Sequence, residues 1–142
     1  MHKGSASLNR YINAQERIYE KAFTEIENGR KVSHWMWFIF PQIHGLGHSE
    51  MSKKYAIKDL AEAEQFLKHP ILGDRLINIS KLLIQFSDKS AYDIFGSPDD
   101  LKLKSCMTLF SAIKNSPSVF QHIIDQYFDG AKDERTLIMI NS

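Results

Sequence analysis

The sequence lacks the features that mark secreted, membrane-spanning and nucleic-acid-coating proteins. Only one of its 142 residues is cysteine, so no disulfide within the chain can hold the fold together. No apolar run approaches the ~18 to 20 residues that span a bilayer, and the first residues carry no hydrophobic signal segment. Its 18 Lys and Arg nearly balance its 17 Asp and Glu, and the net charge of +1 argues against bulk nucleic-acid binding. These absences predict a cytoplasmic protein without a membrane partner.

The residues that are present fit one ordinary globular domain. Hydrophobic residues make up 43% and charged residues 25% of the chain, close to the average of folded proteins. A chain of this length removes about 70% of its surface from water on folding, which is enough for a core. No repeat, low-complexity tract or linker divides it. We expect residues 1–6 to form a disordered leader and residues 7–142 to form a single domain.

Helical periodicity runs through most of the chain and predicts the fold class. One N-terminal helix is expected between a cap at Ser7 and a stop at residues 28–29, and an apolar stripe over residues 71–86 predicts the central helix. Cap-and-proline pairs at residues 97–98 and 116–117 predict two further helix starts. Other N-caps are expected at Ser33, Ser49, Asp59 and Asp133. Together these patterns predict a mainly α, compact single-domain fold of about six to eight helices.

The most unusual stretch is residues 34–42, His-Trp-Met-Trp-Phe-Ile-Phe-Pro-Gln, here called the aromatic segment. Its proline limits it to a short helix or turn. The rings by themselves favour a hydrophobic plug in the core. In the alternative interpretation, Trp35 or Trp37 lines a cleft and stacks on a planar base, with His34 and Gln42 as polar groups at the edge. Gln42 is the better indicator, because a buried amide must find hydrogen-bond partners.

Two glycines interrupt residues 44–49, here called the glycine loop. Its two histidines lie four residues apart, but the glycines disfavour the helix that this metal-ligand spacing needs, and we predict no metal site. Glycines let backbone N–H groups approach an anion, and a following helix start adds donors. A phosphate cradle would use Gly45, Gly47 and Ser49, with Lys53 or Lys54 adding charge. A plain turn remains the other interpretation of these residues.

Acidic residues are frequent after residue 90, but none is paired at a spacing typical of catalysis. Those considered are Asp93, Asp99, Asp100, Asp129, Asp133 and Glu134. Each has a capping or turn explanation. No Ser-His-Asp, P-loop or dinucleotide-binding signature is present. We expect no cofactor, and the residues alone leave both an enzyme and a binding protein open.

Three segments resemble a bacterial family over about residues 7–140. They are residues 33–42 with Gly45-Leu46-Gly47, residues 94–110 with Asp99-Asp100-Leu101, and residues 128–137 with Asp129-Gly130. On these segments the chain resembles domain-of-unknown-function family 1810 (DUF1810), whose members are sometimes mislabelled calpastatin. The chain departs little from the pattern. Cys106 stands where a small residue such as serine is expected, and its apolar neighbours indicate a core position.

DUF1810 is similar, more distantly, to YbiA-like or NADAR domains. Those domains are helical and are linked to ADP-ribose derivatives and to hydrolysis of N-glycosidic bonds. The resemblance therefore implies a YbiA-like helical fold, whereas chemistry transfers poorly at the level of a fold. The Ser-Glu-His element typical of NADAR domains is not evident here, so the catalytic acid of that superfamily cannot be assigned to any residue.

The leading hypothesis is a domain that binds, and as an enzyme hydrolyses, a nucleotide or ADP-ribose-type small molecule in a cleft between the aromatic segment and the glycine loop. Trp35 or Trp37 would stack on the base, and Asp100 or Asp133 would activate water. The expected ligand-binding residues are His34, Trp35, Trp37, Gln42, Gly45, Gly47, Ser49 and Lys53. The alternative is a noncatalytic protein-interaction module in which the aromatic segment is core or partner patch. The sequence predicts no oligomeric state.

Overall fold

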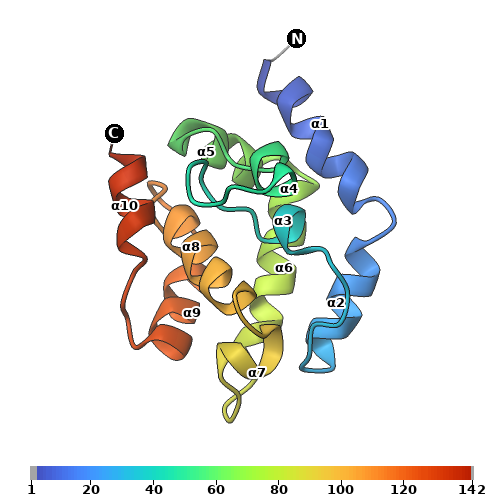
Figure 1. The fold of residues 1–142 in the computed structure, drawn as a ribbon, viewed down its shortest axis with the longest axis vertical. Helices are drawn as coiled ribbons and strands as arrows, with labels where there is room; N and C mark the ends of the chain where they lie inside the picture. The colour runs from blue at the N-terminus through green and yellow to red at the C-terminus, as the bar shows by residue number, and fades with distance from the viewer. Residues whose placement is uncertain (1–2, 142) are drawn as a thin grey trace.

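The computed structural model describes residues 3–141, and this part of the chain forms ten helices (Figure 1). They are α1 (Lys3–Gln15), α2 (Tyr19–Glu27), α3 (Met36–Ile39), α4 (Glu50–Lys54), α5 (Leu60–Lys68), α6 (Leu72–Ile84), α7 (Ala91–Phe95), α8 (Asp99–Ser111), α9 (Val119–Phe128) and α10 (Glu134–Ile140). The predicted mainly α, single-domain fold is confirmed. The helices outnumber the prediction partly because α3, α4 and α7 have only four or five residues each.

The N-terminal helix expected as one element is two helices. α1 ends at Gln15, and a turn over residues 16–18 leads into α2. The buried Gln15 amide donates to the Phe38 carbonyl at 2.8 Å, and its oxygen accepts from Arg75 at 3.3 Å. These contacts anchor the end of α1, and because they are tertiary the apolar period does not reveal them.

The start of α1 also differs from the prediction. Residues 1 and 2 of the expected leader lie outside the described residues, as does Ser142, and α1 already begins at Lys3. Ser7 was expected to cap this helix, and that prediction is wrong, because the helical turn continues through the residues before it. A serine inside a helix costs little, so its side chain alone does not fix the boundary.

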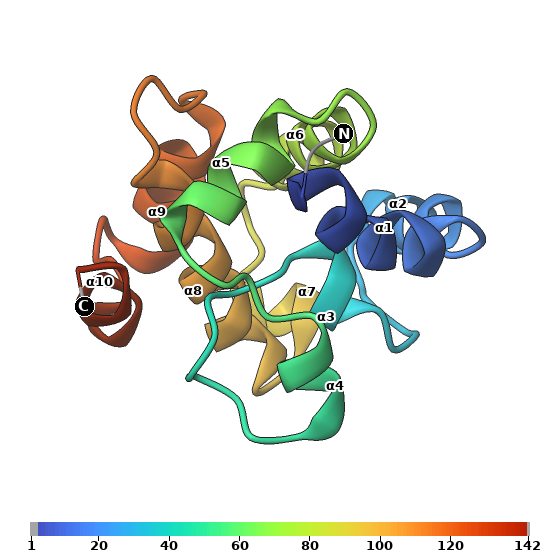
Figure 2. The same cartoon turned by 90° about the horizontal axis from the view of Figure 1, so that it is seen from above.

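Helix α6, expected to be the central helix, shares the centre of the packing with α8. It packs against α2, α5 and α9, while α8 packs against α5, α7, α9 and α10. Figure 1 shows α1 and α2 on one side of α6 and α8, α9 and α10 on the other. Figure 2 shows the loop between α3 and α4, which contains the glycine loop, as a wide arc at the edge of the molecule. The largest completely buried side chains are Trp35, Tyr11, Phe40, Phe66, Phe110 and Phe120.

Three of the expected N-caps are confirmed. Ser49, Asp59 and Asp133 each accept a hydrogen bond from the backbone N–H three residues later, at 3.1, 2.8 and 2.9 Å. Such a side chain satisfies one of the backbone donors left free in the first helical turn. Asp133 in this way fixes where α10 begins, next to the candidate site described below. No helix in residues 3–141 has the length and apolar character to cross a bilayer.

Candidate ligand-binding site

Four hydrogen bonds to the buried carboxylate of Glu25, on α2, position the start of the aromatic segment. Its Oε1 accepts from the backbone N–H groups of Val32 and Ser33 at 2.8 and 2.9 Å and from the Trp35 indole N–H at 2.9 Å. Its Oε2 accepts from the Ser33 hydroxyl at 2.7 Å. Ser33 therefore does not cap α3 as expected, because its hydroxyl is bound to Glu25. Burial would raise the pKa of Glu25, but these hydrogen bonds outweigh it and lower the pKa to about 2.

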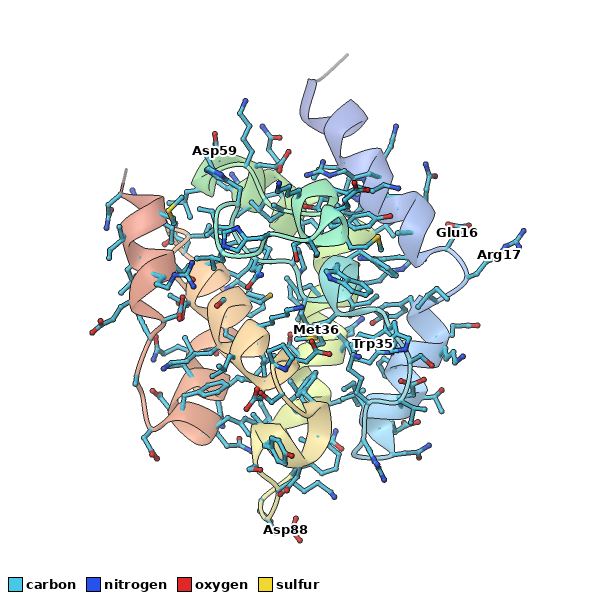
Figure 3. The ribbon with its side chains drawn as sticks, in the orientation of Figure 1. Glu16, Arg17, Trp35, Met36, Asp59 and Asp88 are labelled. Carbon is cyan, nitrogen blue, oxygen red and sulfur yellow. The ribbon has the colours of Figure 1, made fainter. Side chains whose placement is uncertain are left out.

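The aromatic segment divides between core and surface. Trp35 is completely buried, and its ring lies against Phe40 and Phe95. Figure 3 shows Trp35 within the body of the molecule, in contrast to Arg17 and Asp88 at its edge. The expectation that Trp35 stacks on a ligand base is therefore wrong, because protein atoms cover the ring and Glu25 holds its N–H. Trp37 is only half-buried and is the indole that a ligand can reach.

Of the two polar ends of the segment, only Gln42 faces the hollows next to Trp37. It lines a small hollow of about 10 Å³ together with Trp37 and Lys102. It also lines two larger hollows, described next. His34 is exposed and lines none of these three hollows. The structure thus separates the two residues that the sequence hypothesis placed together at the edge of one cleft.

The first large hollow, here called the α8 groove, has a volume of about 450 Å³. It lies between the segment that follows α3, one side of α8, and the start of α10. Its lining residues are Gln42, Leu46, Gly47, Pro98, Leu101, Lys102, Lys104, Ser105, Asp133 and Arg135. Three of them are cationic and one is acidic, so basic side chains gather here although the chain as a whole is nearly neutral.

An ion-pair chain holds Lys102 at the edge of this groove. Asp99 pairs with Lys102 at 3.7 Å and, through its other oxygen, with the largely buried Lys31 at 2.9 Å. The Lys102 ammonium also lies 5.6 Å from the centre of the Trp37 ring, within the range of a cation–π contact. Asp99 therefore connects the loop before the aromatic segment to α8 and fixes a cation between Trp37 and the groove.

The second large hollow, here called the glycine-loop hollow, has a volume of about 290 Å³. Its lining includes Gln42, His44, Gly45, Gly47, His48, Ser52 and Lys53. Gly45 has φ +93°, and a Cβ atom there would lie 2.7 Å from the Cε of Met139 on α10. Gly47 has ordinary φ, but a Cβ atom there would lie 2.6 Å from Ser52. Gly45 is thus favoured by its positive φ, and Gly47 by the close approach of Ser52.

Ser49 and the candidate acids have structural partners. Ser49 caps α4 and donates its hydroxyl to Ser52 at 2.9 Å, and it does not line the glycine-loop hollow. Asp100 accepts from the backbone N–H of Leu101 and lines none of the three hollows. Asp133 lines the α8 groove, but its carboxylate also caps α10 through Thr136. Of the two candidate acids, the structure places only Asp133 at a hollow.

The structure gives no sign of metal or thiol chemistry in the part of the chain that it describes. His44 and His48 line the same hollow, yet no group of three His, Cys, Asp or Glu side chains among residues 3–141 is placed to hold a metal ion. Cys106 is completely buried, as its apolar neighbours predict, and burial raises the pKa of its thiol. A thiol without access to solvent is inert as a nucleophile.

The sequence hypothesis missed the cations of the α8 groove. Lys102, Lys104 and Arg135 lie about 60 to 90 residues after Gln42 in the chain, and no local motif marks them. The stretch around Asp99-Asp100-Leu101 contributed to the family resemblance, but within it the sequence hypothesis assigned a role at the site only to Asp100, as a candidate acid. Only the packing of α8 and α10 brings these side chains to the loop after α3.

The comparisons with known proteins agree with the resemblance to DUF1810. A family model described as "Protein of unknown function (DUF1810)" matches residues 5–140. The chain is also similar to the crystal structure of the conserved hypothetical protein Rv1873 from Mycobacterium tuberculosis, with 41% sequence identity and a TM-score of 0.92. That similarity covers 95% of this chain and 96% of the other. Comparison with curated protein sequences gives no significant match.

Proposed function

The chain belongs to the DUF1810 family, whose description names no activity, and we propose from its own site that it binds a nucleotide or ADP-ribose-type small molecule in the α8 groove. One observation carries the proposal. Lys102, Lys104 and Arg135 line a groove that Gln42 also lines, next to the half-buried Trp37. The distant resemblance to ADP-ribose-linked YbiA-like domains motivated the same ligand class.

The charge of the groove favours a phosphorylated ligand. Lysine ammonium groups act as point charges, and the planar guanidinium of arginine can bond two phosphate oxygens at once. Asp133 is the single acidic residue among those that line the groove. Because the net charge of the whole chain is only +1, this local excess of cations is a property of the site and not of the surface in general.

The uncharged part of the ligand would lie against the aromatic segment. Gln42 has both a donor and an acceptor, as recognition of a base or ribose requires. Trp37 adds apolar ring surface, and Lys102 beside it adds charge. Trp37 is the one candidate of the two for contact with the base, since Trp35 belongs to the core.

Calorimetric titration with ADP-ribose, AMP and inorganic phosphate tests the binding proposal. Arg135 is exposed, so Arg135→Gln should leave the fold intact and weaken ADP-ribose binding by about tenfold. Arg17→Gln is the matched control, because Arg17 projects from the opposite edge of the molecule (Figure 3). If wild-type protein gives neither heat nor a thermal shift at millimolar ligand, the proposal is wrong, since a ligand at one hundred times its Kd stabilises by about 2.7 kcal/mol.

Hydrolysis of an N-glycosidic bond is the second part of the proposal, and Asp133 is the acid that we assign to it. Water would add to the anomeric carbon as the bond from that carbon to the base nitrogen breaks. Asp133 would take a proton from the water, and the departing base would take a proton from solvent. Asp133→Asn is informative because asparagine is an equally good N-cap for α10. Release of free base should fall by about a hundredfold or more, while ligand affinity changes little. Unchanged turnover in this variant would remove Asp133 from the reaction.

An interaction module is the rival function, and one observation favours it. Leu101 lines the α8 groove but is 58% exposed, an unusual position for a leucine in a site for small polar ligands. A protein partner would cover this leucine. Leu101→Gln should then abolish capture of that partner while ADP-ribose affinity stays within about twofold, which distinguishes the two functions.

A further inference from the structure

The glycine-loop hollow and the α8 groove are neighbours that share two of their walls. Gln42 and Gly47 line both hollows. The small hollow under Trp37 joins them further, because it shares Lys102 with the α8 groove and Ser52 with the glycine-loop hollow. Gln42 is the residue common to all three. The arrangement is therefore one site with two compartments, divided by a single side chain and a glycine.

Gly47, which lines both hollows, places no side chain between them. A Cβ atom at its position would lie 3.6 Å from the Gln42 amide nitrogen and 2.6 Å from Ser52. A side chain at position 47 would thus press against Ser52 and lie next to the Gln42 amide. Among residues 3–141 the Gln42 side-chain amide has no protein hydrogen-bond partner, although the Gln42 carbonyl accepts from Ile57 at 2.9 Å. The Gln42 amide is therefore free to form hydrogen bonds with a ligand that extends from one hollow into the other.

The glycine-loop hollow has the lining of an anion site. His44, His48 and Lys53 bring nitrogen donors to it from both ends of the loop, and no described acidic side chain lines it. Glu50, on the first turn of α4, is exposed and lies outside the lining. The two histidines are too few for a metal centre, as noted above. Nitrogen donors without carboxylates suit phosphate better than hard cations such as Mg²⁺ and Ca²⁺, which take oxygen ligands.

We propose that the glycine-loop hollow is a second phosphate subsite of the same site, so that the preferred ligand carries two phosphate groups at separate positions, as a nucleoside bisphosphate does. This inference rests on the proposed function of the α8 groove and narrows its ligand class. One phosphate of the ligand lies in the α8 groove near Arg135, and the other lies in the glycine-loop hollow near Lys53. The uncharged part of the ligand lies between them, against Gln42.

Calorimetry with adenosine 3′,5′-bisphosphate and AMP tests this inference directly. Wild-type protein should bind the bisphosphate about tenfold more tightly than AMP, because a second charge-assisted contact is added. Lys53→Gln should remove most of that tenfold advantage, whereas Arg135→Gln should weaken the binding of both nucleotides alike, because each places a phosphate in the α8 groove. Lys54→Gln is the matched control, since Lys54 is the next residue on the same exposed helix, carries the same charge and does not line the hollow.

The possible outcomes separate this inference from the function on which it rests. If both nucleotides bind but with equal affinity, or if Lys53→Gln and Lys54→Gln behave alike, the second subsite is wrong and the α8 groove alone binds ligand. If neither nucleotide nor inorganic phosphate binds at millimolar concentration, the proposed function fails and the subsite with it. A bisphosphate preference that Lys53→Gln removes and Lys54→Gln retains supports both.

Discussion

At the scale of single residues, Glu25 does the most to place the aromatic segment. One carboxylate receives four hydrogen bonds from three residues, two of them from consecutive backbone N–H groups. Hydrogen bonds to an ionised acceptor are stronger than neutral ones, and a buried donor that loses its partner costs about 1–3 kcal/mol. Glu25 therefore fixes the entry of the chain into α3, which in turn determines where Trp37 and Gln42 lie.

Replacing the Glu25 carboxylate should make the free energy of unfolding depend less on pH in the acidic range. The pKa of Glu25 is lowered from 4.5 to about 2 in the folded protein, so its ionised form stabilises the fold above about pH 4.5. This contribution is lost as the pH falls from about 4.5 towards 2. Glu25→Gln should cost about 2 kcal/mol at neutral pH, and the difference from wild type should shrink towards pH 2. Urea denaturation over this pH range measures the difference.

Glu27→Gln provides the control for this experiment. Glu27 is exposed on the same helix and loses the same charge. The free energy of unfolding of the Glu27→Gln variant should stay within about 0.5 kcal/mol of the wild-type value. A Glu25→Gln variant that differs from wild type by a constant amount at every pH would contradict the hydrogen-bonded, ionised state described here.

At the scale of elements, the crossing of α5 and α6 depends on a backbone contact at Gly73. A Cβ atom at Gly73 would lie 1.9 Å from the carbonyl oxygen of Leu67, and backbone atoms cannot move aside as a flexible side chain can. The helices are joined by a short turn, in which the Gly73 N–H donates to His69 at 2.8 Å. The glycine lets α6 start directly against the end of α5.

Gly73→Ala should therefore destabilise the protein strongly, although alanine is the better helix former. We expect a loss of about 3 kcal/mol or more, because the contact forces α5 and α6 apart. Asn78→Ala, at an exposed position of the same helix, should be neutral or slightly stabilising. Thermal unfolding followed by circular dichroism compares the two variants. A Gly73→Ala protein as stable as wild type would show that the crossing can shift without cost.

At the scale of the whole molecule, a single core connects all the elements that build the site. Its buried hydrophobic side chains run from Leu8 in α1 to Ile124 in α9, and they include the inner face of the aromatic segment. The α8 groove exists only where the outer surfaces of α8, α10 and the loop after α3 meet, whereas the glycine-loop hollow is lined by residues 42–56 alone. The α8 groove therefore depends on the complete fold, because no single element carries enough of its lining.

This single core predicts one cooperative unfolding transition. Trp35 is completely buried in the core and Trp37 lies half-buried beside it, so tryptophan fluorescence reports on the aromatic segment. Circular dichroism reports on the helices throughout the chain. The two signals should give the same midpoint in urea, as expected for a domain of this size. Fluorescence that changes at a lower urea concentration would mean that the aromatic segment unfolds separately from the helices.

The sequence alone determined the features that depend on neighbours along the chain. N-caps at Ser49, Asp59 and Asp133 and the central helix follow from local hydrogen bonding and apolar period, because their partners lie within a few residues. The aromatic segment and its neighbours were enough to identify the family. The glycine loop was also correctly singled out as an unusual backbone stretch, although its ligand remains a proposal.

Only the tertiary structure decided which side chains meet. Three features join residues from separate elements: the break after Gln15, the burial of Trp35 against Glu25, and the groove that Gln42 shares with Lys102, Lys104 and Arg135. Such contacts have no local period or spacing, since they depend on how helices cross and on which face of each helix is left outside the core. For this reason the sequence indicated the side of the candidate site that the aromatic segment and the glycine loop form, whereas the charged side, formed by α8 and α10, follows only from helix packing.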